Sequence, residues 1–209
     1  MYRRAVNILG GYVNQTVCLE HPLLFSLTIC ILLHRYGLLL KHCNQKLCNI
    51  GFSLSPAKYA EIFDYYNNLE EKIRLLRSTL SVPLFVSLFS SFSTLYFALA
   101  ASLKGNAEST YIFEQGINAF VAIVVLFSLS VYCSRIPDYM MEIKTTVRSL
   151  INKYQLQNVD EGREINFLLR MEKMDAVYMS ACGMVDFKRS LLFTAFGTFF
   201  TYGVLIINT

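Results

Sequence analysis

The side chains able to support acid–base or metal chemistry are few, and most lie near one apolar segment. The three histidines are His21, His34 and His42, and Cys43 and Cys48 follow the last of them. Zinc sites usually combine cysteine and histidine at short, regular spacings, and the spacing of His42, Cys43 and Cys48 matches no common zinc pattern. We therefore expect neither a metal site nor a cofactor.

The sequence motifs of the common enzyme classes are missing. The chain has no Gly-rich phosphate loop, no G-x-S-x-G nucleophile turn and no H-E-x-x-H pair. It also lacks a basic patch with interleaved aromatic residues, which would indicate nucleic-acid binding. Glu114, at the edge of an apolar segment, is typical of a solvated residue at a membrane interface. We expect neither an enzyme nor a partner nucleic acid.

The composition instead indicates a lipid bilayer as the main partner of the chain. Hydrophobic residues make up 54% and charged residues 16% of the sequence, whereas soluble domains carry about 25% charged residues. Three segments contain no Asp, Glu, Lys or Arg: Leu84–Leu103, Ile117–Cys133 and Ser190–Asn208. Each is close to the roughly 20 apolar residues that cross a hydrocarbon core of about 30 Å. We predict an all-α, polytopic helical membrane protein.

A fourth candidate span is interrupted by charge. Pro22–Leu33 is apolar, His34 and Arg35 follow, and Tyr36–Leu40 is apolar again. An arginine near a helix end can extend its guanidinium to the lipid headgroups. We therefore place a span at residues 17–41, with an interfacial or buried helix as the alternative.

Basic residues indicate which side of the membrane each loop occupies. The long connections Lys46–Arg77 and Arg135–Arg189 carry most of them, whereas the short connection Gly105–Thr110 has only Lys104 beside it. Because positive charge near span ends favours the cytoplasm, we expect long cytoplasmic helical extensions and an extracellular C-terminus. The expected order is an extracellular segment (1–16), a transmembrane helix (17–41), a cytoplasmic helical loop (42–82), a transmembrane helix (83–104), a short extracellular loop (105–111), a transmembrane helix (112–134), a cytoplasmic helical loop (135–189) and a last transmembrane helix (190–208).

Four spans and an extracellular C-terminus require an extracellular N-terminus. The tripeptide Asn14-Gln15-Thr16 is an N-glycosylation acceptor pattern, which agrees with this side. No signal peptide is evident after Arg3 and Arg4. We therefore expect further sequence upstream of Met1.

Apolar residues recur at helical spacing in both long loops. Ser55-Pro56 predicts a helix start, and an apolar stripe follows over Tyr59–Leu80. The second loop has one stripe over Ile143–Tyr154 and another over Phe167–Val185. These helices either lie on the membrane or pack within the chain, or they form a cytoplasmic bundle that packs against neighbouring subunits.

The last span carries small and hydroxyl residues on one helical face. The members of this face are Thr194, Gly197, Thr198, Thr201, Leu205 and Asn208. Small and hydroxyl residues permit close approach of helices in a membrane. They can equally line a water-filled path that has an apolar constriction.

The C-terminal region resembles a known family. Ser180-Ala-Cys-Gly183, Arg189-Ser-Leu-Leu-Phe193, and Thr201-Tyr202 with five residues before Asn208 resemble the C-terminal signature of arthropod gustatory receptors. The residues matching that signature are Gly183, Ser190, Leu191, Leu192, Thr201, Tyr202 and Asn208. Upstream, His34-Arg35-Tyr36 resembles the inner end of the family's fourth span, and Tyr65–Leu80 resembles the approach to its fifth span.

The resemblance implies spans four to seven of a seven-span taste receptor subunit in the plasma membrane, and hence a partial sequence. Family members are tetrameric cation channels, as homo- or hetero-tetramers, gated by a small-molecule tastant, and their seventh helix lines the pore. The candidate pore-lining residues are then Thr201, Leu205 and Asn208. The family's Gln is Asn208 here, and Lys188 stands where an acidic residue is common. The alternatives are a non-channel four-span membrane adaptor, a truncated modulatory subunit, or a small transporter.

Overall fold

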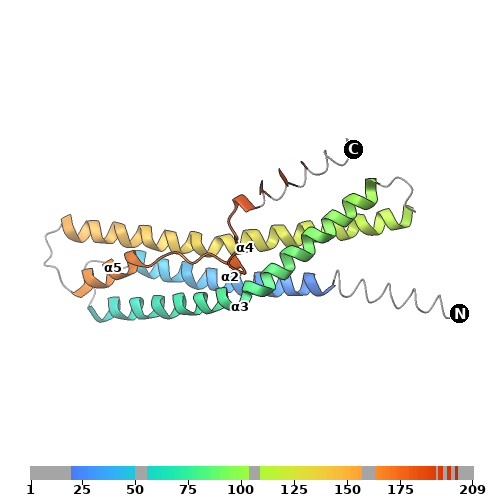
Figure 1. Cartoon of the computed structure of the whole chain (residues 1–209). Helices are drawn as coiled ribbons and strands as arrows, with labels where there is room; N and C mark the ends of the chain where they lie inside the picture. Colours follow the sequence, from blue (N-terminus) through green and yellow to red (C-terminus); the bar gives the residue numbers. More distant parts are fainter. Residues whose placement is uncertain are drawn as a thin grey trace. The chain divides into compact units, whose positions relative to one another are not determined.

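Three long helices dominate the chain. The computed structural model describes residues 20–49, 56–103, 109–156 and 163–191, together with residues 193, 194, 197, 198 and 201. Within these ranges lie α2 (His21–Cys48), α3 (Pro56–Leu103), α4 (Ser109–Leu156), the shorter α5 (Arg163–Lys173), and the two-residue strands β1 (Ser180–Ala181) and β2 (Val185–Asp186) (Figure 1). The all-α fold predicted from the sequence is confirmed.

The long helices exceed the thickness of a bilayer. Helices α3 and α4 each contain 48 residues and continue through Pro83 and Pro137 respectively. Pro56 opens α3 at a position where the missing N–H of proline costs nothing. At about 1.5 Å per residue a helix of this length spans about 72 Å, against about 30 Å for a hydrocarbon core. Only part of each helix can therefore lie in lipid.

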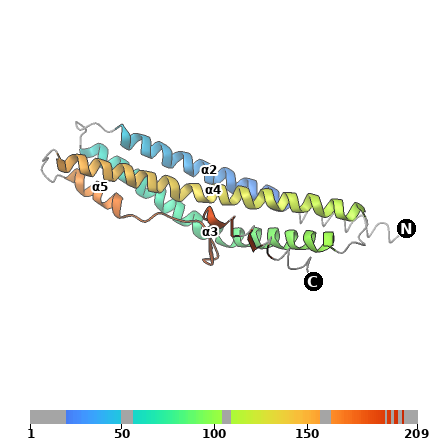
Figure 2. The same ribbon diagram turned by 90° about the horizontal axis from the view of Figure 1, so that it is seen from above.

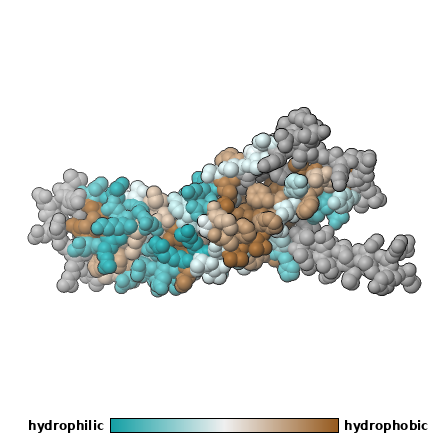
Figure 3. Space-filling view, in the orientation of Figure 1, coloured by the Kyte–Doolittle hydropathy of each residue, from teal (hydrophilic) through white to brown (hydrophobic). Residues whose placement is uncertain are grey.

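Each long helix contributes one portion to each of two compact units. Unit 1 comprises Met1–Ile31, Ser81–Tyr132 and Ser180–Thr209, and unit 2 comprises Leu32–Leu80 and Cys133–Met179. Helices α2, α3 and α4 are each long and apolar enough to cross a membrane. The charge-free stretches of α3 and α4 belong almost entirely to unit 1, whereas most charged side chains of these helices belong to unit 2. Brown, hydrophobic surface gathers over the unit 1 portions of the helices and teal, hydrophilic surface over the unit 2 portions (Figure 3). Residues 32–41 of the expected first span are part of unit 2.

Unit 1 has the side-chain distribution of a helix bundle in lipid. Large apolar side chains such as Phe89, Phe97 and Phe120 are exposed. The buried side chains include leucines and alanines and also several serines: Ser26, Ser87, Ser91 and Ser130. Small and hydroxyl residues at buried positions let membrane helices approach closely, because lipid provides no hydrophobic drive for their association. The confirmed fold class is therefore that of a polytopic helical membrane protein.

Unit 2 is an amphipathic bundle built from parts of α2, α3 and α4 together with α5. Its core contains Leu40 and Leu47 of α2, Tyr66 and Ile73 of α3, Met140, Ile143 and Val147 of α4, and Leu168 and Met171 of α5. Helix α5 lies beside α3 and α4 in both ribbon views (Figure 1 and Figure 2). The Phe63 and Phe167 ring centroids are 5.4 Å apart, and Arg148 Nε lies 3.0 Å from Glu172 Oε1. The described side chains of the apolar stripes over Tyr59–Leu80 and Ile143–Tyr154 therefore pack within the chain.

One sequence prediction about unit 2 is wrong. The stripe over Phe167–Val185 was expected to form a helix, but α5 ends at Lys173 and residues 175–179 have no regular secondary structure. Val177, Met179 and Ala181 are buried at alternate positions, which is the spacing of an extended segment. Apolar residues recur in this stretch both at every second position and at about every fourth position, so the sequence fits an extended segment as well as a helix. The contact with α4 favours the extended segment. Cys182, expected in or at the end of a helix, lies in a turn instead.

Candidate functional site

The family-signature residues Ser180–Gly183 form a β-hairpin that precedes the last helix. Ala181 pairs with Val185 and Ser180 with Asp186 in an antiparallel ladder. Cys182 and Gly183 occupy the connecting turn with φ of 51° and 70°, and Met184 N–H donates to the Ala181 carbonyl at 3.0 Å. Glycine adopts such left-handed backbone angles at little cost. The signature glycine is therefore a turn residue, which explains its chemical type.

The hairpin is attached to α3 through the backbone. The Cys182 N–H donates to the Ser81 carbonyl at 3.2 Å, and the Cys182 Sγ lies 3.9 Å from the same oxygen. Ser81 stands two residues before Pro83, whose missing N–H leaves one carbonyl of the preceding turn without its helical partner. The hairpin therefore contacts α3 where the hydrogen bonding of that helix is locally weakened.

A short charged turn leads from the hairpin into the last helix. Lys188 Nζ lies 3.9 Å from Asp186 Oδ2, and both side chains are largely exposed. The Lys188 N–H donates to the Asp186 carbonyl at 2.9 Å, and Leu191 N–H donates to the Lys188 carbonyl at 3.0 Å. Lys188, which departs from the common acidic residue, thus has an acidic neighbour of its own. An exposed pair of this kind contributes little stability.

The described residues of the last helix carry a ladder of hydroxyl groups on one exposed face. Thr194 Oγ1 donates to the Ser190 carbonyl at 3.1 Å, Thr198 to that of Thr194 at 2.9 Å, and Thr201 to that of Gly197 at 2.8 Å. Each hydroxyl proton is therefore engaged within the helix. The hydroxyl oxygens on this face therefore offer only lone pairs to a partner.

The structure describes only some of the residues singled out from the sequence. Gly183 is in the hairpin turn, Ser190 and Leu191 lie at the start of the last helix, and Thr201 is exposed on the hydroxyl ladder. The remaining ones, Leu192, Leu205, Tyr202, Asn208 and the glycosylation candidate Asn14, lie outside the described residues or have undescribed side chains. In the described part of the chain, no three His, Cys, Asp or Glu side chains converge as metal ligands.

A cavity of about 570 Å³ lies in unit 1 between α2 and α3. Phe25, Val82 and Val86 are among its apolar lining residues, and His21, Ser87 and Ser90 provide polar atoms. Pockets for small molecules have this range of volume and this mixture of apolar walls and few polar groups. It is a candidate site for a small apolar ligand.

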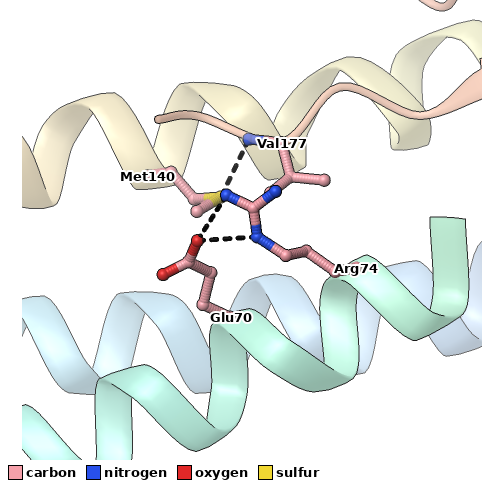
Figure 4. A network of polar contacts seen from close by, with 4 residues as sticks. All are labelled: Glu70, Arg74, Met140 and Val177. Atoms are coloured by element: carbon pink, nitrogen blue, oxygen red, sulfur yellow. Dashed lines mark hydrogen bonds and ion pairs between the residues drawn. The ribbon is translucent and has the colours of Figure 1, made fainter. Parts of the chain in front are cut away.

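Unit 2 contains a polar cluster that no sequence pattern indicated (Figure 4). The Glu70 carboxylate is 8% exposed and lies 2.7 Å from the Arg74 guanidinium, which also donates through Nε at 2.8 Å. Burial raises the pKa of Tyr66, one turn before Glu70, and the Glu70 carboxylate raises it further. In the same view, the Val177 N–H donates to Met140 Sδ at 3.4 Å, which connects the segment after α5 to α4 (Figure 4).

Sequence signals for these features are local and weak. Glu70 lies on the same helix face as the apolar stripe, four residues after Tyr66. Arg74 follows four residues later, which is the spacing of a helical ion pair. The Cys182-Gly183 pair was the available turn signal, but it stood inside an apparently helical stripe. Nothing near Ser81 in the sequence indicates a partner 101 residues away.

Residues 21–208 match the model of one protein family, described as 7tm chemosensory receptor. The chain belongs to this family. No curated protein matches the chain. The resemblance drawn from the C-terminal signature is thus confirmed at the level of the chemosensory receptor family. With the long apolar helices, membership establishes this chemosensory receptor as a multi-pass membrane protein of a receptor family rather than an enzyme family.

Proposed function

We propose that this chemosensory receptor is a taste receptor subunit that acts as a ligand-gated cation channel in the plasma membrane. The observation that carries the channel proposal is the exposed hydroxyl ladder of the last helix, whose oxygen lone pairs face outward. Oxygen atoms are the ligands that hard cations prefer. In this proposal Thr201, Leu205 and Asn208 line the pore, with Leu205 as its apolar constriction.

The proposal includes an assembly and an orientation. The subunit forms a homo- or hetero-tetramer with related subunits and responds to a small-molecule tastant. Its spans correspond to spans four to seven of the seven-span family, with cytoplasmic long loops and an extracellular C-terminus. The exposed apolar side chains of Met184 in the hairpin and Phe193 in the last helix support the assembly, since a neighbouring subunit could cover them. The basic character of unit 2 supports the orientation.

Ligand-evoked current tests the channel proposal. The complete open reading frame is expressed with surface delivery confirmed, and cation current is recorded across a broad tastant panel. Thr201→Cys should make that current sensitive to a cationic thiol reagent, whereas Phe193→Cys, about 80° away from Thr201 around the helix, should not. Silence across the panel would count against a channel. A chain that is silent alone but changes the current of a co-expressed relative would favour the modulatory subunit.

A further inference from the structure

Each long helix has an arginine as the first charged residue beyond its uncharged stretch. No Asp, Glu, Lys or Arg occurs in residues 21–34, 78–103 or 115–134. Arg35 of α2 follows the first stretch, Arg77 of α3 precedes the second, and Arg135 of α4 follows the third. All three arginines belong to unit 2, and all three are exposed.

Contacts between α2 and α3 bring Arg35 and Arg77 to the same level. The Lys46 ammonium lies 5.5 Å from the centroid of the Tyr65 ring, and the two helices run in opposite directions (Figure 1). Arg35 lies 11 residues before Lys46 in α2. Because α3 runs in the opposite direction, the position at the same level in α3 lies 11 residues after Tyr65. That position is Leu76, the neighbour of Arg77. At about 1.5 Å per residue the two arginines differ in level by less than one helical turn.

Contacts between α2 and α4 bring Arg135 to this level as well. Asn44 bonds to Glu142 at 3.0 Å, and Cys48 Sγ lies 4.0 Å from Thr146 Oγ1. The two pairs have the same separation in the chain, 98 residues, so α2 and α4 run parallel. The same separation places Arg35 beside Cys133, two residues from Arg135.

The surroundings of the three arginines are those of a lipid–water interface. Exposed apolar side chains lie within one or two turns of each of them: Leu38, Leu75 and Met141. Tyr36 adjoins Arg35, and the Tyr139 ring packs 3.0 Å from the position that a Cβ at Gly37 would take. Tyrosine and arginine together are typical of helix segments at the headgroup level. Asp138 lies one turn from Arg135, whereas neither Arg35 nor Arg77 has an acidic residue within a turn of its own helix.

We propose that Arg35, Arg77 and Arg135 bind the phosphate groups of anionic phospholipids at one common level of the membrane. The planar guanidinium donates paired hydrogen bonds that match phosphate oxygens. Helix α2 adds Lys41 within two turns of Arg35, and it has no acidic residue from His21 to Cys48. The inference rests on the proposed orientation, because anionic lipids are concentrated in the cytoplasmic leaflet. The site would fix the depth of all three helices in the membrane.

Lipid titration of the full chain tests this site. The chain is purified in a non-denaturing detergent and titrated with a fluorescent phosphatidylinositol bisphosphate in the same micelles. A basic side chain near a membrane surface contributes about five-fold in affinity for anionic lipid. Arg35→Gln with Arg77→Gln should therefore weaken binding about 25-fold. The matched control, Lys153→Gln with Lys173→Gln, removes the same charge from exposed positions away from this level and should change binding less than two-fold.

Three outcomes would overturn the proposal. The first is an unchanged lipid affinity in the Arg35→Gln, Arg77→Gln double variant. The second is an equal loss of affinity in this variant and in the lysine control. The third is that soluble inositol trisphosphate competes with the fluorescent lipid as strongly as unlabelled lipid does. Arg35→Lys with Arg77→Lys should lose less than five-fold, because charge is retained. Should the glutamine pair not fold, the single variant Arg77→Gln is expected to lose about five-fold. No current is measured, so failure of the channel proposal and failure of this site are distinguished.

Discussion

Asn44 of α2 donates a hydrogen bond from Nδ2 to Oε1 of Glu142 of α4 at 3.0 Å, across 98 residues of chain. One turn further along both helices, Cys48 meets Thr146. Two successive contacts with the same separation fix the register of α2 against α4 within unit 2. This register also sets the common level of the three arginines, so it is the first relationship to test.

A disulfide can test the register directly. The Cys48 Sγ and Thr146 Oγ1 atoms are 4.0 Å apart, which is close enough for a small shift to bring two sulfurs into bonding distance. Thr146→Cys should therefore form a disulfide with Cys48 under mild oxidation, detected as a linked peptide by mass spectrometry. Lys153→Cys, two turns further along α4, should not link to Cys48. Equal yields from both positions would contradict the register.

Thiol labelling provides a second test of unit 2. Burial raises the pKa of the Cys43 thiol to about 11, so at pH 8 only about one molecule in a thousand carries the reactive thiolate. Cys48, one turn away, is exposed. N-ethylmaleimide should therefore modify Cys48 in the folded receptor and leave Cys43 unmodified until the protein is unfolded. Modification of both at similar rates would show that Cys43 is not in the core.

A carboxylate at position 44 should oppose folding. Asn44 is buried, and its Oδ1 has no hydrogen-bond partner among the described residues. In Asn44→Asp, burial and the Glu142 carboxylate both raise the folded-state pKa of the new carboxyl. We expect a loss of about 2 kcal/mol near neutral pH, which shrinks as pH falls through that raised pKa, since protonation then favours the folded state. Asn44→Leu should be close to neutral, because Glu142 is exposed. Thermal unfolding at pH 5 and pH 7.5 measures both variants.

Much of this fold follows from sequence patterns, and the exceptions have a common cause. The apolar stretches and the stripe over Tyr59–Leu80 predicted long helices because helical periodicity is a local property. Residues 174–186 satisfied two periodicities at once, and contacts with distant residues, Met140 and Ser81, favoured a non-helical segment followed by a hairpin. The ion pair of Glu70 was similarly hidden, since an acidic residue beside an apolar stripe does not reveal whether it is buried.

Removal of Arg74 alone should lower the stability of the fold more than removal of both charges of the Glu70–Arg74 pair. Arg74→Leu leaves the nearly buried Glu70 carboxylate without this counter-charge. We expect a loss of about 1–2 kcal/mol, at the low end for a buried pair because Arg74 is half exposed. Adding Glu70→Gln should restore most of it. If the double variant unfolds at the same temperature as Arg74→Leu alone, the lost interaction is the packing of the arginine rather than its charge.

The hairpin turn should tolerate side chains at position 183 in an order set by the backbone alone. Gly183 has a φ of 70°, and a Cβ there would meet nothing within 4 Å. Left-handed backbone costs an ordinary residue about 1–2 kcal/mol, asparagine less, and a β-branched residue more. The stability of the hairpin should therefore fall in the order Gly, Asn, Ala, Val. Gly116→Ala is the matched control, since its Cβ also meets nothing within 4 Å but its helical backbone favours alanine by up to about 1 kcal/mol.

Cys182 offers a local readout of this series, because its N–H donates to the Ser81 carbonyl and its thiol is half-buried. As substitutions loosen the turn, the Cys182 thiol should separate from α3 and react faster with a thiol reagent. Gly183→Val should give the fastest modification, and Gly116→Ala should leave the rate unchanged. A common rate across the 183 series would mean that the turn does not hold the hairpin on α3. The signature glycine would then need an explanation other than its backbone angle.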